Sequence, residues 1–188
     1  MDTIPRQLKL WTVEQYEHLA ETGVFLPDER VELIEGMIVT VPPQRPPHAG
    51  VIRRNTHTLV QRYGKTHYVG VQVPLNTGAL SQPEPDFCLT RKDVVDGEAS
   101  HPSSADLVIE VSDSSLDYDR KVKARIYAAG GIPEYWILNL QDRLVEIHRV
   151  PIQTATGWEY STRFVAKPGE RVAPLFAPEG QLEVADLF

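Results

Sequence analysis

The sequence predicts a single α/β domain. Its 188 residues are enough to enclose one sizeable hydrophobic core. A hydrophobic content of 41% and a charged content of 24% are typical of a soluble globular protein. Segments in which apolar residues alternate, as in half-buried strands, are interleaved with segments in which they recur every three or four residues, as in amphipathic helices. Together these patterns indicate helices packed against a β-sheet.

Three segments have the apolar periodicity of helices. The first is the clearest, because Thr12 can form a capping box with Gln15 and Gly23 can end the helix. The other two also end at glycines. The predicted helices span about residues 12–23, 48–63 and 114–130.

Strands are predicted from short runs of aliphatic and aromatic residues bounded by turn residues. Residues 105–112 form the most hydrophobic run, which favours a central strand. Residues 30–41 are punctuated by Gly36 and form either a hairpin or one long bent strand. Further strands are predicted at residues 68–75, around Asp86, at residues 133–140 and at residues 143–150, and the chain from residue 158 is also β-patterned.

Asp86 and Glu110 are the most informative residues, because each lies in an apolar run that is predicted to be a strand. An ionised carboxylate is costly there unless a cation or hydrogen bonds satisfy it. Strand alternation places Cys88 on the same face as Asp86, and Ser112 on the same face as Glu110. If the two strands are neighbours, the carboxylates can converge on one ion, and their hard oxygen atoms suit Mg²⁺ or Mn²⁺. Taken alone, either carboxylate is better explained by solvent or by an ion pair.

The predicted helix after Glu110 carries Lys123, one turn after Asp119 and one turn before Tyr127. This position could aim the ammonium group at the strand end that bears Glu110. There it could orient a water molecule or stabilise charge that grows on a phosphate. Position alone favours a simpler interpretation, in which Lys123 is a surface residue paired with Asp119.

Three other side chains are candidates for the same site, each with a plainer alternative. Glu32 and Glu35 lie on opposite faces of their segment, and periodicity does not decide which one points inward. His48 starts a predicted helix on its inward row, where it either contacts the site or caps the helix. Gln72 lies opposite the apolar face of its strand and is either a polar group of the site or simply exposed.

The net charge of −7, from 19 Lys and Arg against 26 Asp and Glu, argues against a general nucleic-acid coat protein. It leaves room for an enzyme with a local basic groove. Residues 45–67 reverse the sign, with five Arg and Lys, three of the six histidines and no Asp or Glu. This segment is the best candidate surface for a phosphate backbone, and a solvated helix face or a contact with a partner subunit explains it at least as well.

Other features bound the setting. The single cysteine, Cys88, cannot form an intramolecular disulfide, so a reducing, cytoplasmic environment is the simplest fit. No apolar run approaches the ~18–20 residues of a membrane span, and the amino terminus has no signal-peptide pattern. Gly-rich phosphate loops, CxxC pairs, HExxH motifs and nucleophile elbows are absent from the sequence.

With these residues in place, the chain resembles the Uma-two family of restriction-endonuclease-like proteins, in the PD-(D/E)XK nuclease superfamily. The matching stretches include VELIEGMIV, VQVPL, PEPDF, ADLVIEVSDSSLDYDRKVKARIYAAGGIPEYWILNL and VEIHR, and they span about residues 10–150. The resemblance implies a mixed β-sheet flanked by helices. The expected organisation is one domain over residues 1–188, with an N-terminal helical part (1–30), a nuclease-like core (31–150) and a β-rich C-terminal extension (151–188).

The superfamily pattern places an Asp after a Pro on one strand and Glu-x-Lys on the next. Asp86 and Glu110 match this pattern, but Ser112 stands where the lysine is expected. The family resembles one in which this lysine has moved to the next helix, and Lys123 aligns with it there. Glu32 matches a glutamate from an early element that the superfamily often uses.

The resemblance implies a Mg²⁺- or Mn²⁺-dependent endonuclease acting on DNA, with Asp86 and Glu110 as metal ligands. The expected catalytic residues are Asp86, Glu110, Lys123 and Glu32, and the expected supporting residues are His48, Gln72, Tyr127 and Ser112. Cutting both strands of a duplex favours a homodimer, for which the β-rich tail that ends with residues 184–188 offers apolar surface unless it completes the sheet. The alternatives are a non-catalytic binding or regulatory protein on the same scaffold, which the acidic net charge and Ser112 support, and a phosphoesterase with another substrate.

Overall fold

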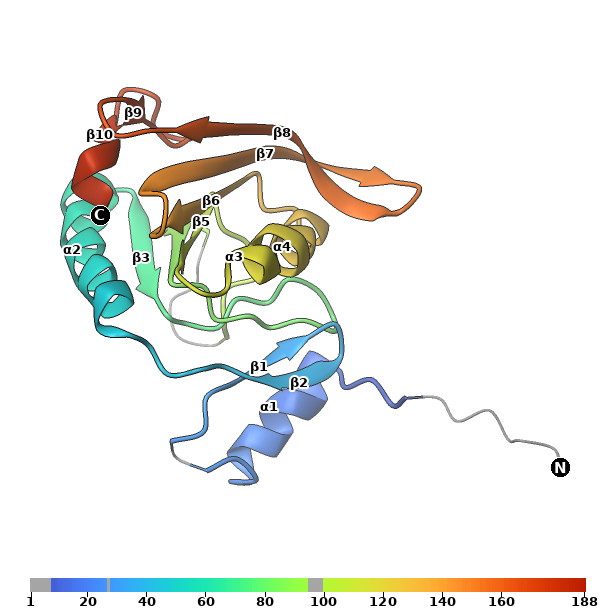
Figure 1. The fold of residues 1–188 in the computed structure, drawn as a ribbon. Helices are drawn as coiled ribbons and strands as arrows, with labels where there is room; N and C mark the ends of the chain where they lie inside the picture. Colours follow the sequence, from blue (N-terminus) through green and yellow to red (C-terminus); the bar gives the residue numbers. More distant parts are fainter. Residues whose placement is uncertain (1–7, 27, 95–99) are drawn as a thin grey trace, which may run out of the picture.

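The computed structural model describes residues 8–26, 28–94 and 100–188, and its centre is a six-stranded mixed β-sheet (Figure 1). The strand order is β3-β4-β5-β6-β7-β8, and neighbours are antiparallel except for the parallel pair β5 and β6. The strands are β3 (His67–Val71), β4 (Phe87–Arg91), β5 (Leu107–Ser112), β6 (Glu134–Asn139), β7 (Leu144–Thr154) and β8 (Gly157–Ala166). Both β5 and β6 are buried along their whole length, so the expectation that residues 105–112 form a central strand is confirmed.

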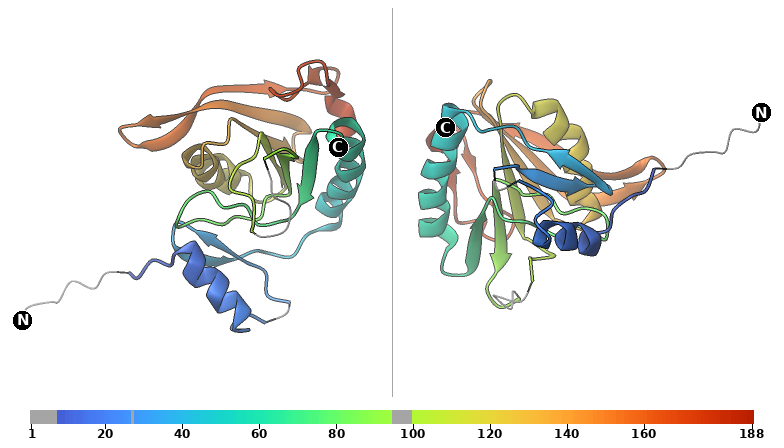
Figure 2. Two further views of the ribbon diagram at one scale, coloured as in Figure 1. Left: turned by 180° about the vertical axis from the view of Figure 1, so that it is seen from behind. Right: turned by 90° about the horizontal axis from the view of Figure 1, so that it is seen from below.

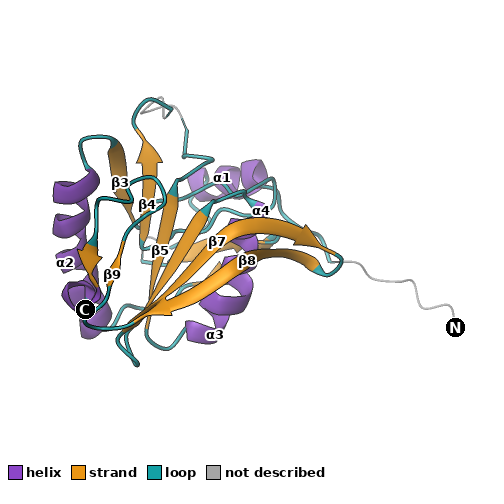
Figure 3. Ribbon diagram, turned by 90° about the horizontal axis from the view of Figure 1, so that it is seen from above, coloured by secondary structure: helices purple, strands orange, loops and turns teal. Residues whose placement is uncertain are grey.

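Helices cover both faces of this sheet (Figure 3). One face packs against α2 (Pro46–Tyr63), and the other against a segment made of α3 (Leu116–Tyr118), the π-helix η1 (Asp119–Lys123) and α4 (Ala124–Ala129). Strand alternation divides the core in the predicted way: Phe87 and Ile109 pack on the α2 side, while Cys88 and Val108 pack on the α4 side. The face that bears Asp86 and Glu110 is therefore the one covered by η1 and α4.

The amino-terminal part is a smaller unit that packs beneath the sheet (Figure 2). It consists of α1 (Val13–Glu21), whose capping box between Thr12 and Gln15 is present, and the hairpin of β1 (Val31–Ile34) and β2 (Met37–Thr40). Glu35 and Gly36 have positive φ angles of 50° and 78°, as the tight turn of such a hairpin requires. Of the two interpretations of residues 30–41, the hairpin is correct.

The carboxyl-terminal segment returns to α2. After the short strands β9 (Arg171–Val172) and β10 (Leu182–Glu183), the 3₁₀ helix η2 (Val184–Leu187) packs on the core beside α2, and Asn55 donates a hydrogen bond to the Leu187 carbonyl at 2.8 Å. Val184 and Leu187 are buried in the protein's own core. The expectation that these side chains offer surface to a second subunit is wrong for both. Strand β7 also runs through the boundary expected after residue 150.

Two elements end differently from the prediction. Strand β3 stops at Val71 instead of Leu75, because Gln72 has a left-handed backbone with φ of 52°. The third helix is divided, with a π-helical turn in its middle. The expected amino-terminal part and the connection between residues 91 and 104 lie partly outside the described residues. None of the helices in the described part of the chain is long and apolar enough to cross a lipid bilayer.

Candidate active site

Asp86 and Glu110 meet where β4 begins. The antiparallel register pairs Phe87 with Ile109. Asp86, just before Phe87, and Glu110, just after Ile109, therefore also lie opposite one another. The Asp86 amide donates to Glu110 Oε2 at 3.3 Å, and the Val111 amide donates to Asp86 Oδ2 at 2.8 Å. Each of the two acidic residues is 7% exposed. The condition that the two strands are neighbours is therefore met, and the carboxylates converge.

Two predicted supporting residues hold the Asp86 carboxylate. Gln72 Nε2 donates to Asp86 Oδ1 at 3.0 Å, and His48 Nε2 lies 3.1 Å from Asp86 Oδ2. The left-handed backbone of Gln72 is a strained conformation for a residue other than glycine, and it turns this amide toward the site. Burial opposes protonation of His48, but the hydrogen bond and the charge of Asp86 outweigh it and raise the pKa of the imidazole.

Lys123 is buried among the carboxylates and is not a surface residue. Its Nζ lies 2.8 Å from Glu32 Oε2, 3.0 Å from Glu32 Oε1 and 3.3 Å from Glu110 Oε1. The surface ion pair with Asp119 that position alone favoured is wrong. The β1–β2 hairpin covers this edge of the helix and supplies the partner carboxylate, an interaction that helical spacing does not reveal. Lys123 ends the π-helical turn, a distortion that is frequent at functional sites.

The structure also chooses between the two glutamates of the hairpin. Glu32 is 4% exposed, pairs with Lys123 and accepts a hydrogen bond from the Glu84 amide at 3.1 Å. Glu35 lies in the turn and pairs with Arg125 at 2.6 Å, with both side chains more than two-fifths exposed. Glu32 is therefore the residue that faces the site.

Tyr127 and Ser112 occupy different positions. The Tyr127 hydroxyl donates to Glu110 Oε1 at 2.6 Å and so orients the carboxylate directly. Ser112 is fully buried, and its Oγ lies 3.4 Å from Ser115 Oγ, in contact with another hydroxyl and not with the carboxylate pair. Ser112 therefore does not take over the role of the lysine that the superfamily pattern expects at its position.

Negative charge exceeds positive charge in this cluster. Burial raises the pKa of Glu110 to about 8; the ammonium group of Lys123 opposes this shift, and the charges of Asp86, Asp119 and Glu32 add to it. Burial lowers the pKa of Lys123, but the charges of Glu110 and Glu32 outweigh this effect and raise it above its usual value. Lys123 is therefore an ammonium ion at neutral pH, able to donate hydrogen bonds and unable to accept a proton.

A pocket of about 700 Å³ opens onto this cluster. Asp86, Glu110, Glu32 and Lys123 lie on its lining. Residues 39–45, the end of β2 and the segment after it, form one wall, and residues between Asp113 and Asp119 form another. The carboxylate pair is thus accessible to a ligand in spite of its burial.

Residues 13–185 match the Uma2 family, whose description is "Putative restriction endonuclease". The chain belongs to this family. A solved structure described as "a putative nuclease belonging to DUF820" from Anabaena variabilis ATCC 29413 has a similar fold, with a TM-score of 0.72 and 17% sequence identity over 94% of this chain and 97% of that chain. A search of curated proteins finds no match. The expected family and the expected mixed sheet flanked by helices are confirmed.

The donor set of this Uma2 site fits a hard divalent cation whose coordination shell the protein would supply only in part. The described residues contain no group of three or more His, Cys, Asp or Glu side chains that could hold a metal ion alone. Mg²⁺ is typically bound by one or two carboxylates, and water and substrate phosphate complete its shell. Asp86 and Glu110 supply two such carboxylates on the lining of an open pocket, and the uncompensated negative charge around Glu110 would be relieved by a cation.

Sequence reasoning missed Asp119 as a residue of the site itself. Its carboxylate is buried on the pocket lining and accepts a hydrogen bond from Ser115 Oγ at 2.6 Å. Burial raises the pKa of Asp119, while the hydroxyls of Ser115 and Ser112 partly offset this effect. The available signal is the position of Asp119 four residues before Lys123, a spacing that by itself also predicts a surface ion pair.

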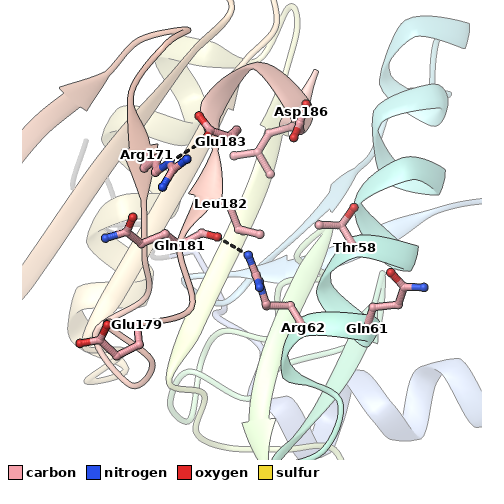
Figure 4. A pocket seen from close by; sticks show the side chains of 10 residues that line it. Thr58, Gln61, Arg62, Arg171, Glu179, Gln181, Leu182, Glu183 and Asp186 are labelled. Carbon is pink, nitrogen blue, oxygen red and sulfur yellow. Dashed lines mark hydrogen bonds and ion pairs between the residues drawn. The ribbon is translucent and has the colours of Figure 1, made fainter.

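A second pocket, of about 590 Å³, lies between α2 and the carboxyl-terminal segment (Figure 4). It contains none of the predicted site residues. Arg62 donates to the Gln181 carbonyl and Arg171 pairs with Glu183, so both cations on its lining are already satisfied (Figure 4). This pocket marks where the tail joins the core.

Proposed function

We propose that this protein is a metal-dependent nuclease that hydrolyses phosphodiester bonds of DNA. The observation that carries the proposal is the convergence of the Asp86 and Glu110 carboxylates on one pocket, beside the buried ammonium group of Lys123. Membership of a family whose description is "Putative restriction endonuclease" supports it.

Asp86 and Glu110 would hold Mg²⁺ or Mn²⁺. When bound, such an ion polarises a phosphoryl oxygen and lowers the pKa of a water molecule. His48 and Gln72 fix the direction of the Asp86 carboxylate, and Tyr127 fixes that of Glu110. These contacts hold the carboxylate oxygens in place before a metal ion or substrate binds, which is the preorganisation that catalysis requires.

Lys123 would act by hydrogen bonding and charge. Because its pKa is raised, the ammonium group keeps its protons and can donate a hydrogen bond to a phosphate oxygen or to the attacking water. Glu32 accepts from Lys123 at 3.0 Å and holds the amine in the pocket. The placement of Glu32 and Lys123 on separate elements, β1 and η1, makes the site depend on the docking of the hairpin.

The test is cleavage of labelled DNA with Mg²⁺ or Mn²⁺ by wild type, Asp86→Asn and Lys123→Met. We expect each substitution to reduce the rate by about 100-fold or more, as for the loss of one preorganised charged group. Glu35→Gln is the control, because Glu35 lies on the hairpin that carries Glu32 but outside the site. Unchanged metal-dependent cleavage by either site variant would defeat the proposal.

A non-catalytic binding protein on the same scaffold is the second candidate. It is favoured by one observation, the ion pair in which Lys123 already partly neutralises Glu110. Titration of Mn²⁺ separates the two, because a nuclease site should bind the ion and Asp86→Asn should weaken that binding.

For a duplex substrate we infer a cytoplasmic homodimer that cuts both strands. Sedimentation of the purified protein measures its oligomeric state.

A further inference from the structure

We propose that the pocket beside Asp86 and Glu110 contains a subsite for an unpaired nucleobase, with Tyr118 as its stacking platform. This inference rests on the proposed nuclease function, and it specifies which form of nucleic acid reaches the site. Tyr118 ends α3 and directly precedes Asp119 of the π-helix, so it lies next to the elements that carry the charged groups.

The Tyr118 ring is accessible to a ligand in the pocket. It lines the same pocket as the carboxylate pair and is 38% exposed. Among the described residues the hydroxyls of Tyr118 and of the exposed Tyr68 have no hydrogen-bond partner, whereas those of Tyr16, Tyr63, Tyr127, Tyr135 and Tyr160 all donate to one; of the two, only Tyr118 lines this pocket. Partial burial and the charges of Glu32, Asp119 and Glu110 raise the pKa of Tyr118, although Lys123 opposes this, so the ring carries no charge at neutral pH.

The rest of the pocket provides apolar surface and room for a base. Val39, Val41, Pro42 and Pro43 line it without any charge of their own. Its volume of about 700 Å³ lies within the range of roughly 300–1,000 Å³ that is usual for small-ligand pockets. Water and one phosphate at the carboxylates do not explain these apolar walls, whereas the flat face of a nucleobase does.

The charge of the pocket excludes a long stretch of backbone. Its lining has six carboxyl groups, on Glu32, Glu84, Asp86, Glu110, Asp113 and Asp119, against three permanent cations, on Arg30, Arg45 and Lys123, and the imidazole of His48. Duplex binding depends on many phosphate contacts with basic surface. In a duplex the ring faces are also hidden by stacking, and only an unpaired or extruded nucleotide can offer a face to an aromatic side chain. The pocket is therefore suited to one scissile phosphate with an unpaired neighbour.

Binding of a single-stranded oligonucleotide that contains 2-aminopurine tests the subsite without cleavage. The parent is Asp86→Asn, which removes the proposed metal ligand, and it is compared with the same protein carrying Tyr118→Ala, Tyr118→Phe or Tyr68→Ala. We expect 2-aminopurine fluorescence to be quenched on binding, and Tyr118→Ala to weaken binding by about 5- to 140-fold, the equivalent of one lost base stack. Tyr118→Phe keeps the ring and should bind like the parent.

Tyr68→Ala is the matched control, because Tyr68 is an exposed tyrosine on β3 that lies under Lys92. Equal affinity of Tyr118→Ala and its parent, or equal losses in Tyr118→Ala and Tyr68→Ala, would overturn the subsite.

Cleavage by the wild type separates this inference from the proposed function. We expect single-stranded and bulged DNA to be cut faster than a blunt, fully paired duplex, by about fivefold or more if one base stack is lost on the duplex. Equal rates on all substrates overturn the preference for unpaired bases and leave the nuclease intact. Cleavage of none of them overturns the nuclease, and the fluorescence comparison then decides the subsite alone.

Discussion

Replacing Lys123 by Met should leave the buried carboxylates of Glu32 and Glu110 without their cation. Methionine has a similar length and no charge, so the change removes the ion pairs at 2.8 Å and 3.3 Å while keeping most of the packing. Removing one partner of a buried ion pair typically costs about 3–5 kcal/mol of folding free energy, because the remaining charge is stranded. The loss is expected to be within this range when both carboxylates are ionised.

The size of the loss should depend on pH. The folded-state pKa of Glu110 is about 8 with Lys123 present, and it should rise further without the ammonium group. A group whose pKa is raised by folding stabilises the folded state at low pH, and this stability is lost as the pH rises through the folded pKa. The deficit of Lys123→Met should therefore increase between pH 8 and pH 9 by up to about 1.4 kcal/mol, the free energy of one pKa unit.

Urea denaturation of wild type and Lys123→Met at pH 7 and pH 9 measures this deficit. Lys121→Met is the matched control, because Lys121 lies on the same π-helical turn and makes an exposed ion pair with Asp117 that is worth about 0–1 kcal/mol. A deficit for Lys123→Met no larger than that of the control, or one that shrinks as the pH rises, would refute the buried ion pair.

Three further predictions concern the metal, the basic segment and the core. Because a proton on Glu110 must leave before a metal binds, Mn²⁺ affinity measured by calorimetry should rise about tenfold per pH unit up to pH 8; a flat profile would contradict this. Arg53 and Arg54 have no carboxylate partner among the described residues, so the double variant Arg53→Glu/Arg54→Glu should bind DNA with a weaker salt dependence. The slope of log K against the logarithm of salt concentration should become less negative by about 0.7–0.9 for each lost phosphate contact, whereas Arg163→Glu on β8 should leave it unchanged. Burial lowers the pKa of His148 to about 4, so this group's contribution to stability is complete above pH 6.5 and is lost as the pH falls toward 4. Acid titration of His148→Phe should lack that loss of up to about 3 kcal/mol, and an unchanged profile would contradict it.

The carboxylate pair was predictable from the sequence because its geometry is set by local rules. Alternation along two strands fixes the face of Asp86 and of Glu110, and the burial of such residues has few explanations. That β4 and β5 are neighbours required the further assumption of strand order, which the structure confirms.

The partners of that pair were less predictable because they depend on contacts between distant segments. Whether Glu32 or Glu35 faces inward is set by the docking of the hairpin on the segment between β3 and β4, where the Gln82 amide donates to the Leu33 carbonyl. The burial of Lys123 depends on the same hairpin, and helix periodicity therefore assigned it to the surface. Gln72 reaches Asp86 through a left-handed backbone that a strand pattern does not predict.

The fate of the tail shows the same limit. Apolar residues at 184–188 indicate a buried contact, but composition does not say with which surface. The 3₁₀ geometry of η2 and the hydrogen bond from Asn55 to the Leu187 carbonyl assign that contact to α2.

The central claim is that Asp86 and Glu110 hold one divalent cation between them. Anomalous diffraction from a crystal soaked in Mn²⁺ tests it most directly. One peak within coordination distance of both carboxylates in wild type, absent in Asp86→Asn, is the predicted result. No peak there at saturating Mn²⁺, or a peak bound by other residues, would contradict it.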